Sequence, residues 1–157
     1  MLSGDMIYST AMNITGVTAD VARCETDFVI VSQRHYGRRI PIAMGECKAS
    51  GEITDGDVQN LKRVADAFEG TRMEPFIVFA KTASFTREEI TRCQTAQKAY
   101  GHRVILLSGR ELEPYFVYER TEKEFEIRSS AVSFEDLARA TEGIYFNPRP
   151  KQPSTTQ

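Results

Sequence analysis

The sequence predicts an α/β fold, with a central mixed β-sheet that is flanked by helices and starts with an antiparallel hairpin. Three observations predict it. Short apolar runs alternate with segments of helical period. The first two runs are joined by a short turn and the later ones are separated by helices, so the first pair should be antiparallel and the rest largely parallel. The 157 residues are 41% hydrophobic and 27% charged, as in one ordinary globular domain.

The hairpin comes first along the chain. One arm, residues 25–33, contains the β-branched run Val29-Ile30-Val31, and the other arm spans residues 39–48. A polar turn around Gly37 joins the arms. Both arms carry apolar residues on both faces, which indicates strands that are covered by a layer on each side.

The later elements follow from hydrophobic period and capping signals. Residues 55–69 repeat apolar side chains at helical spacing. Residues 87–100 do the same behind a capping box formed by Thr86 and Glu89. The other expected elements are buried strands at 76–80 and 103–108, a short strand near 14–23, a helical turn at 111–115, strands within 116–128 and a helix over 133–142.

One domain is expected over residues 1–147, with its core at about 25–108. Residues 148–157, rich in Pro, Ser, Thr and Gln, are expected to form a disordered tail or linker. The chain contains no apolar segment long enough to span a membrane and no signal-peptide pattern at its start, so we expect a cytoplasmic protein with no membrane partner. Its three cysteines form no metal-ligand pattern and are expected to be reduced thiols.

The register of the hairpin brings chemically useful side chains together. A turn centred on Tyr36-Gly37 places Asp27 opposite Glu46, with Cβ atoms roughly 5 Å apart. The same register places Glu25 opposite Lys48. Glu46 and Lys48 are two residues apart, so they share one face of their strand. Two carboxylates and an amine therefore converge at one end of the hairpin, unless a bulge shifts the register by a residue.

Two carboxylates at this separation repel each other unless a cation lies between them. Mg²⁺ prefers oxygen ligands and keeps several waters, with Mn²⁺ as its substitute. Such an ion polarises a phosphoryl oxygen and lowers the pKa of a bound water. Lys48 can position or activate that water, or offset charge on the phosphate. The sequence thus predicts Asp27, Glu46 and Lys48 as a catalytic group for phosphodiester hydrolysis, with Asp27 and Glu46 as metal ligands.

Asp27 in ETDFVIV and Glu46-Cys47-Lys48 in IAMGECKAS resemble the motif of the PD-(D/E)XK superfamily. That superfamily includes restriction endonucleases, archaeal-type Holliday-junction resolvases and many repair and defence nucleases, and its strand and helix order is similar to that of residues 25–108. The resemblance implies a Mg²⁺-dependent DNA (endo)nuclease of restriction, phage defence or repair, with RNA not excluded. It also implies that the backbone carbonyl of Cys47 joins the metal ligands and that a polar residue such as Gln59 faces the site.

Other features of the sequence remain open. Glu25 and Gln59 are candidate accessory residues. Lys62 and Arg63 are candidate nucleic-acid contacts, although surface charge is the simpler interpretation. A formal net charge of −2 means that nucleic-acid binding needs a local basic patch or help from another domain or subunit. A homodimer is one option. The superfamily core opens with a helix, which residues 1–22 do not predict.

Two other functions compete with the nuclease. The first is a non-catalytic nucleic-acid-binding or scaffolding domain of the same fold within a larger protein. The second is a different α/β enzyme in which Asp27, Glu46 and Lys48 form only a structural salt bridge. Binding of Mg²⁺ or Mn²⁺ would distinguish the nuclease from the scaffold.

Overall fold

The structure is a computed structural model of the chain and describes residues 6–15, 24–32, 39–68, 70–100, 103–112 and 133–148. The strands in this part of the chain are β1 (Met6–Ile14), β2 (Cys24–Ser32), β3 (Ile40–Lys48), β4 (Met73–Lys81) and β5 (Val104–Leu107). They form one sheet in the order β1-β2-β3-β4-β5. The pairs β1–β2 and β2–β3 are antiparallel, whereas the pairs β3–β4 and β4–β5 are parallel. The predicted mixed sheet with an antiparallel start is confirmed.

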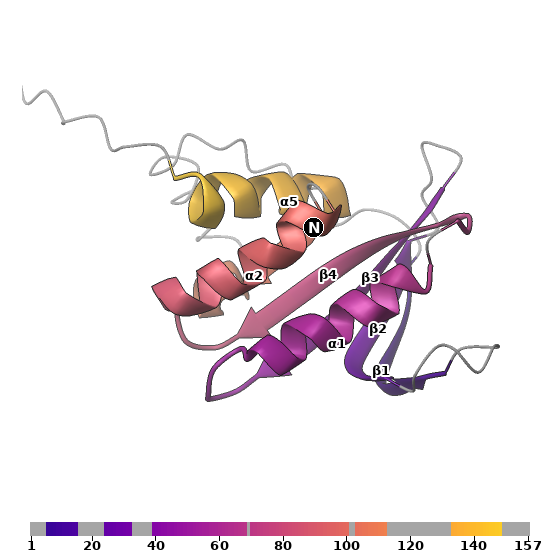
Figure 1. The fold of residues 1–157 in the computed structure, drawn as a ribbon, viewed down its shortest axis with the longest axis horizontal. Coiled ribbons are helices and arrows are strands. Elements are labelled where there is room, and N and C mark those ends of the chain that lie inside the picture. Colours follow the sequence, from indigo (N-terminus) through magenta and orange to yellow (C-terminus); the bar gives the residue numbers. More distant parts are fainter. Residues whose placement is uncertain are drawn as a thin grey trace, which may run out of the picture.

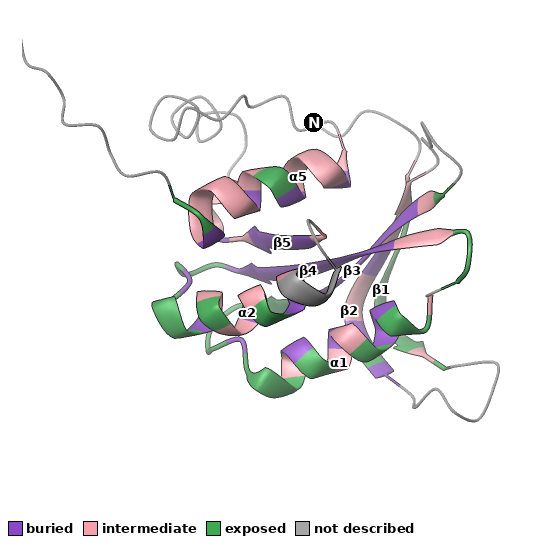
Figure 2. Cartoon of the chain, turned by 45° about the horizontal axis from the view of Figure 1, so that its top comes forward, coloured by how far each residue is buried: buried purple, intermediate pink, exposed green. Residues whose placement is uncertain are grey.

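Helices flank this sheet on both faces (Figure 1). They are α1 (Asp55–Asp66), α2 (Arg87–Tyr100), α3 (Gly109–Leu112) and α5 (Phe134–Thr141), which continues into a π-helical turn, η1 (Glu142–Phe146). α1 and α2 cover one face, and α5 covers the other (Figures 1 and 2). No helix of the described residues is long and apolar enough to cross a membrane.

Two buried apolar clusters lie on the two faces of the sheet. Met44 of β3 packs with Leu61 of α1 in one cluster. The neighbouring Ala43 belongs to the other cluster, with Phe134 of α5. Successive residues of β3 thus point to opposite faces and are buried on both, as the continuous apolar run predicts. The edge strand β1 is mostly exposed, in contrast to β3 and β4 (Figure 2).

Most predicted elements are confirmed with shifted ends. The helix expected over 55–69 ends at Asp66, and Gly70 follows with a φ of 76°. The helix expected over 87–100 has those bounds. The helix expected over 133–142 begins behind its N-cap, Ser133, and changes to π-helical geometry at Glu142. The strands expected within 116–128 and the tail over 149–157 lie outside the described residues.

The first strand lies earlier than the sequence predicted. The expected strand over 14–23 overlaps β1 only at Ile14, and residues 16–23 fall outside the described part of the chain. β1 shows little burial on either face, so its sequence carries no alternating apolar pattern.

The alternation of side chains shifts within β1 and β2. Cys24 and Val29 both belong to the α1-side cluster although they are five residues apart. The β1–β2 ladder steps over Ala11 and Asp27, and Ala11 has a φ of 51°, in the left-handed region. Asp27 therefore lies at a position of β2 that the ladder with β1 leaves unpaired.

Candidate active site

The predicted hairpin register is confirmed where β2 and β3 form their ladder, from Val31 opposite Ile42 to Phe28 opposite Gly45. Beyond Gly45, side chains take over the links between the two strands. The buried Thr26 hydroxyl donates to the Gly45 carbonyl at 2.8 Å. Asp27 Oδ2 accepts a hydrogen bond from the backbone N–H of Cys47 at 2.6 Å. The backbone pairing of the two strands thus ends next to Glu46, and the Asp27 side chain bridges them at Cys47.

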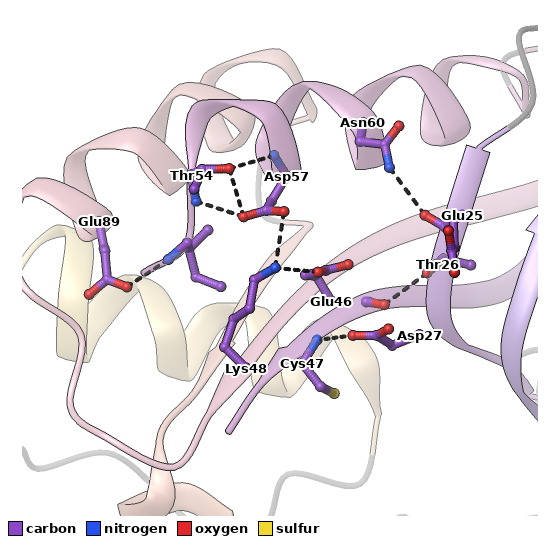
Figure 3. A network of polar contacts seen from close by, with 12 residues as sticks. Glu25, Thr26, Asp27, Glu46, Cys47, Lys48, Thr54, Asp57, Asn60 and Glu89 are labelled. Carbon is purple, nitrogen blue, oxygen red and sulfur yellow. Dashed lines mark hydrogen bonds and ion pairs between the residues drawn. The ribbon is translucent and has the colours of Figure 1, made fainter. Parts of the chain in front are cut away.

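Lys48 has two carboxylate partners on the α1 side of the sheet (Figure 3). Its Nζ lies 2.6 Å from Glu46 Oε1 and 3.2 Å from Asp57 Oδ1. The side chains of Lys48, Glu46 and Asp57 are only 27%, 19% and 17% exposed, respectively. The hydrogen bond to Glu46, followed by that to Asp57, raises the pKa of Lys48 although burial opposes it. The amine is therefore a fixed positive charge in this state.

Asp57 belongs to the capping box of α1. Its backbone N–H donates to Thr54 Oγ1 at 3.2 Å, and its Oδ2 accepts from Thr54 N at 2.7 Å. Burial raises the pKa of Asp57, but the hydrogen bonds from Thr54 and Lys48 outweigh it and lower the pKa overall. Asp57 was not among the site residues that the sequence predicted. The T-x-x-D pattern before an amphipathic helix, close behind the E-x-K triplet, was the signal that could have found it.

The backbone of Cys47 faces β2. In an extended strand the N–H and C=O of one residue point to the same edge. Because the Cys47 N–H donates to Asp27, its carbonyl is also directed toward β2. One residue later, the Lys48 carbonyl accepts from Thr82 N at 3.3 Å on the β4 side, in keeping with this alternation. The Cys47 carbonyl is therefore directed toward the same side of β3 as the Asp27 carboxylate.

The oxygen atoms of the predicted metal ligands suit a hard divalent cation by their chemistry. Asp27, Glu46 and the Cys47 carbonyl would supply only oxygen, which Mg²⁺ prefers. Burial, then the charges of Asp27 and Glu46, raise the pKa of the exposed Cys47 thiol. Within the described residues, no group of three His, Cys, Asp or Glu side chains could hold a metal. An ion here would need the backbone carbonyl and water to complete its coordination.

The other predicted residues lie around this group. Glu25 is exposed, and the β2–β3 ladder ends at Phe28 and Gly45, so the expected strand pair of Glu25 with Lys48 is not formed. Instead, the Glu25 carbonyl accepts from Asn60 Nδ2 at 3.1 Å.

Three candidates come from α1. Gln59 is exposed on the helix, between residues whose side chains contact Lys48 and Glu25. Lys62 is half-buried on the next turn. Arg63 is exposed and its Nη2 donates to Asn60 Oδ1 at 2.9 Å, which leaves its role in binding nucleic acid a prediction.

A buried ion pair supports the loop that leads from Lys48 to α1. Glu89, at 0% side-chain exposure, lies 2.8 Å from Lys81 Nζ, which is 5% exposed. The same carboxylate accepts from Ile53 N at 2.8 Å (Figure 3). Arg92 donates to the Ile53 carbonyl at 2.9 Å. From the sequence, Glu89 was predicted only to cap the helix over 87–100. Its second function, holding the loop before α1, depends on tertiary structure.

Comparisons with known proteins add little beyond the fold. No protein-family model matches the chain. No curated protein matches it either. Among solved structures, the MspJI restriction endonuclease in complex with a 27-mer oligonucleotide is similar, with a TM-score of 0.40 and 15% sequence identity. The match covers 90% of this chain and 28% of that protein, so the chain spans about a quarter of the length of the endonuclease.

Proposed function

We propose that this chain is a metal-dependent nuclease that hydrolyses DNA phosphodiester bonds. One observation carries the proposal. At the end of the β2–β3 hairpin, the Asp27 carboxylate accepts a hydrogen bond from the backbone N–H of Cys47, and Glu46 forms an ion pair with Lys48. The resemblance of the motif to PD-(D/E)XK nucleases supplies the substrate, and RNA is an outcome of the test.

The proposed roles follow from the positions of the groups. Asp27, Glu46 and the Cys47 carbonyl would hold Mg²⁺ at the end of the hairpin. The bound ion would polarise a phosphoryl oxygen and lower the pKa of a coordinated water. Lys48, beside Glu46 and charged, would orient the attacking water or compensate the charge that develops on the phosphate. Asp27 accepts from the Cys47 N–H and Glu46 forms an ion pair with Lys48, so both carboxylates would share or give up these contacts on binding the ion.

Cleavage of labelled DNA and RNA in the presence of Mg²⁺ tests the proposal. We expect Lys48→Ala to lower the cleavage rate by about a hundredfold or more, because a positioned proton-transfer or charge-stabilising group is lost. The matched control is Arg139→Ala, which removes a cation that is 72% exposed on α5. Equal cleavage by wild type and Lys48→Ala would reject the assignment of Lys48, and activity that survives removal of Mg²⁺ by a chelator would reject the metal.

A non-catalytic nucleic-acid-binding or scaffolding domain is the second candidate. The specific observation in its favour is that the site's polar groups already have protein partners. Lys48 is neutralised by two carboxylates, and Asp27 is bonded to a backbone N–H. Such an arrangement would also serve as a structural salt bridge at the end of a hairpin.

A further inference from the structure

Lys48 is held from two different elements, and only one of its partners belongs to the proposed metal site. Glu46 lies on the same strand, whereas Asp57 lies on α1 (Figure 3). We propose that Asp57 is a positioning residue that keeps the Lys48 amine in place when a divalent cation draws Glu46 away from it. The inference rests on the proposed function, because it needs Glu46 to act as a metal ligand.

Glu46 has two competing tasks in the proposed mechanism. Its Oε1 is 2.6 Å from Lys48 Nζ, a short and strong charge-assisted contact. A carboxylate that binds a divalent cation shares its charge with that cation, and its attraction for the amine falls. Lysine carries a compact charge on a flexible four-carbon chain, so an amine without another partner would turn to solvent. Asp57 Oδ1, at 3.2 Å, is positioned to prevent this.

Asp57 is suited to this task because its own position is fixed. Its Oδ2 accepts from both the backbone N–H and the hydroxyl of Thr54, at 2.7 and 2.8 Å. The adjacent Ile53 N–H is held by the buried Glu89 of α2. One oxygen of Asp57 thus binds Thr54 at the start of α1, and the other contacts Lys48. The position of the amine is therefore fixed relative to the helix.

Zero-length cross-linking of amines to carboxylates in the metal-free protein tests the contact directly. Mass spectrometry of the wild type should detect Lys48 linked to Glu46 and to Asp57. In Glu46→Gln, which mimics the withdrawal of Glu46, the link from Lys48 to Asp57 should persist at wild-type yield. In Asp57→Asn it should be lost while the link to Glu46 remains. Absence of the Lys48–Asp57 link in Glu46→Gln would overturn the proposal, whether or not the chain cleaves DNA.

Kinetics then separate positioning from mere helix capping. We expect Asp57→Asn to lower kcat by about tenfold or more with little change in KM, because a misplaced amine affects the transition state rather than substrate binding. Asp57→Glu, which preserves a carboxylate at a position where capping boxes favour Glu, should recover much of the loss. Asp55→Asn removes a carboxylate from the same turn, 85% exposed, and should leave kcat unchanged.

The outcomes distinguish the two proposals. Thr54→Ala weakens the cap but leaves the Asp57 carboxylate, so a loss of kcat in Thr54→Ala as large as that in Asp57→Asn would reduce the role of Asp57 to capping and reject positioning. If Lys48→Ala and Asp57→Asn both retain wild-type kcat, the nuclease assignment of Lys48 fails. If only Asp57→Asn retains it, the proposed function stands and the inference about Asp57 fails.

Discussion

Asp27 stabilises the hairpin at the point where its backbone pairing stops. The strand arithmetic placed Asp27 opposite Glu46, and the ladder keeps that register as far as Phe28 and Gly45. The sequence could not indicate that Asp27 would accept from the Cys47 N–H, because strand pairing predicts no contact between a side chain and the neighbouring backbone. At the residue scale, the register was predictable from the turn and the apolar runs, but the local departure from it was not.

The partner of Lys48 shows the same limit. Strand pairing predicted Glu25, on the assumption that the ladder continues to the end of β3. In the structure Asp57 takes that place, because α1 turns back over the sheet after the loop that follows β3. A contact between a strand and a helix cannot be obtained from strand pairing, although the capping-box residues could have been predicted to lie near the end of β3.

Gly45 leaves the space that the ring of Phe28 and the backbone of β4 occupy beside it. A Cβ at this position would overlap the ring of Phe28 and lie 2.9 Å from the carbonyl oxygen of Val78, a backbone atom that cannot move easily. We expect Gly45→Ala to lower the free energy of unfolding by about 2 kcal/mol, as overpacking typically does. Urea denaturation measures the change.

Gly56→Ala is the matched control for this prediction. A Cβ at Gly56 would lie 3.5 Å from Thr54 Oγ1, an ordinary contact, and alanine favours helix. Its stability should be equal to or greater than that of the wild type. Similar destabilisation by both substitutions would show that steric overlap at Gly45 is not the cause.

Elements with clear punctuation were the easiest to predict. α1 and α2 each have a capping box and an apolar face, and the buried strands β4 and β5 are short apolar runs. β1 was misplaced because both of its faces are largely exposed, including Ile7 and Tyr8 at 61% and 75%. Hydrophobic periodicity reports burial, so an exposed edge strand gives little signal.

Glu89 joins three elements, and its ionisation should make their packing sensitive to acid. Burial raises the pKa of Glu89, but the hydrogen bonds from Lys81, Thr86 N and Ile53 N outweigh it and lower the pKa to about 2. A depressed folded-state pKa stabilises the protein above the unfolded-state value, which is about 4.3 for Glu. This stabilisation is lost as the pH falls from about 4.3 toward 2.

Glu89→Gln should therefore destabilise the protein at pH 7 by about 3 kcal/mol, because it leaves Lys81 buried with no carboxylate partner. The difference from the wild type should narrow at pH 3. Urea denaturation at both pH values measures it, and Glu88→Gln, an exposed neighbour in the same turn, should behave as the wild type. A difference that is equal at pH 7 and pH 3 would contradict the assignment of the low pKa to Glu89.

At the scale of the whole molecule, the carboxyl ends of the parallel strands β3 and β4 form one charged edge. Lys48 and Lys81 are paired in register at this edge, and each is neutralised by carboxylates from the helices that follow. Ligand sites in sheets of this kind lie at the carboxyl ends of parallel strands. The overall α/β architecture was predictable because the alternation of strands and helices leaves few topologies. The ion pairs of Lys48 with Asp57 and of Lys81 with Glu89 could be identified only from the structure.

Divalent-metal binding by the intact chain distinguishes the nuclease from the scaffold. An ion that binds only the folded state stabilises it by about 2.7 kcal/mol at a concentration a hundred times its Kd. We expect Mn²⁺ to raise the Tm of the wild type and of Asp55→Asn, and to leave the Tm of Asp27→Ala and Glu46→Gln unchanged. Each variant is compared with itself with and without metal, because losing the hydrogen bond between Asp27 and the Cys47 N–H lowers stability by itself.

A nuclease site must gain stability from the ion, whereas a salt bridge that is complete without metal gains none. A wild type whose Tm does not respond to Mn²⁺ would therefore favour the scaffold, and an equal response in Asp27→Ala would place the ion elsewhere.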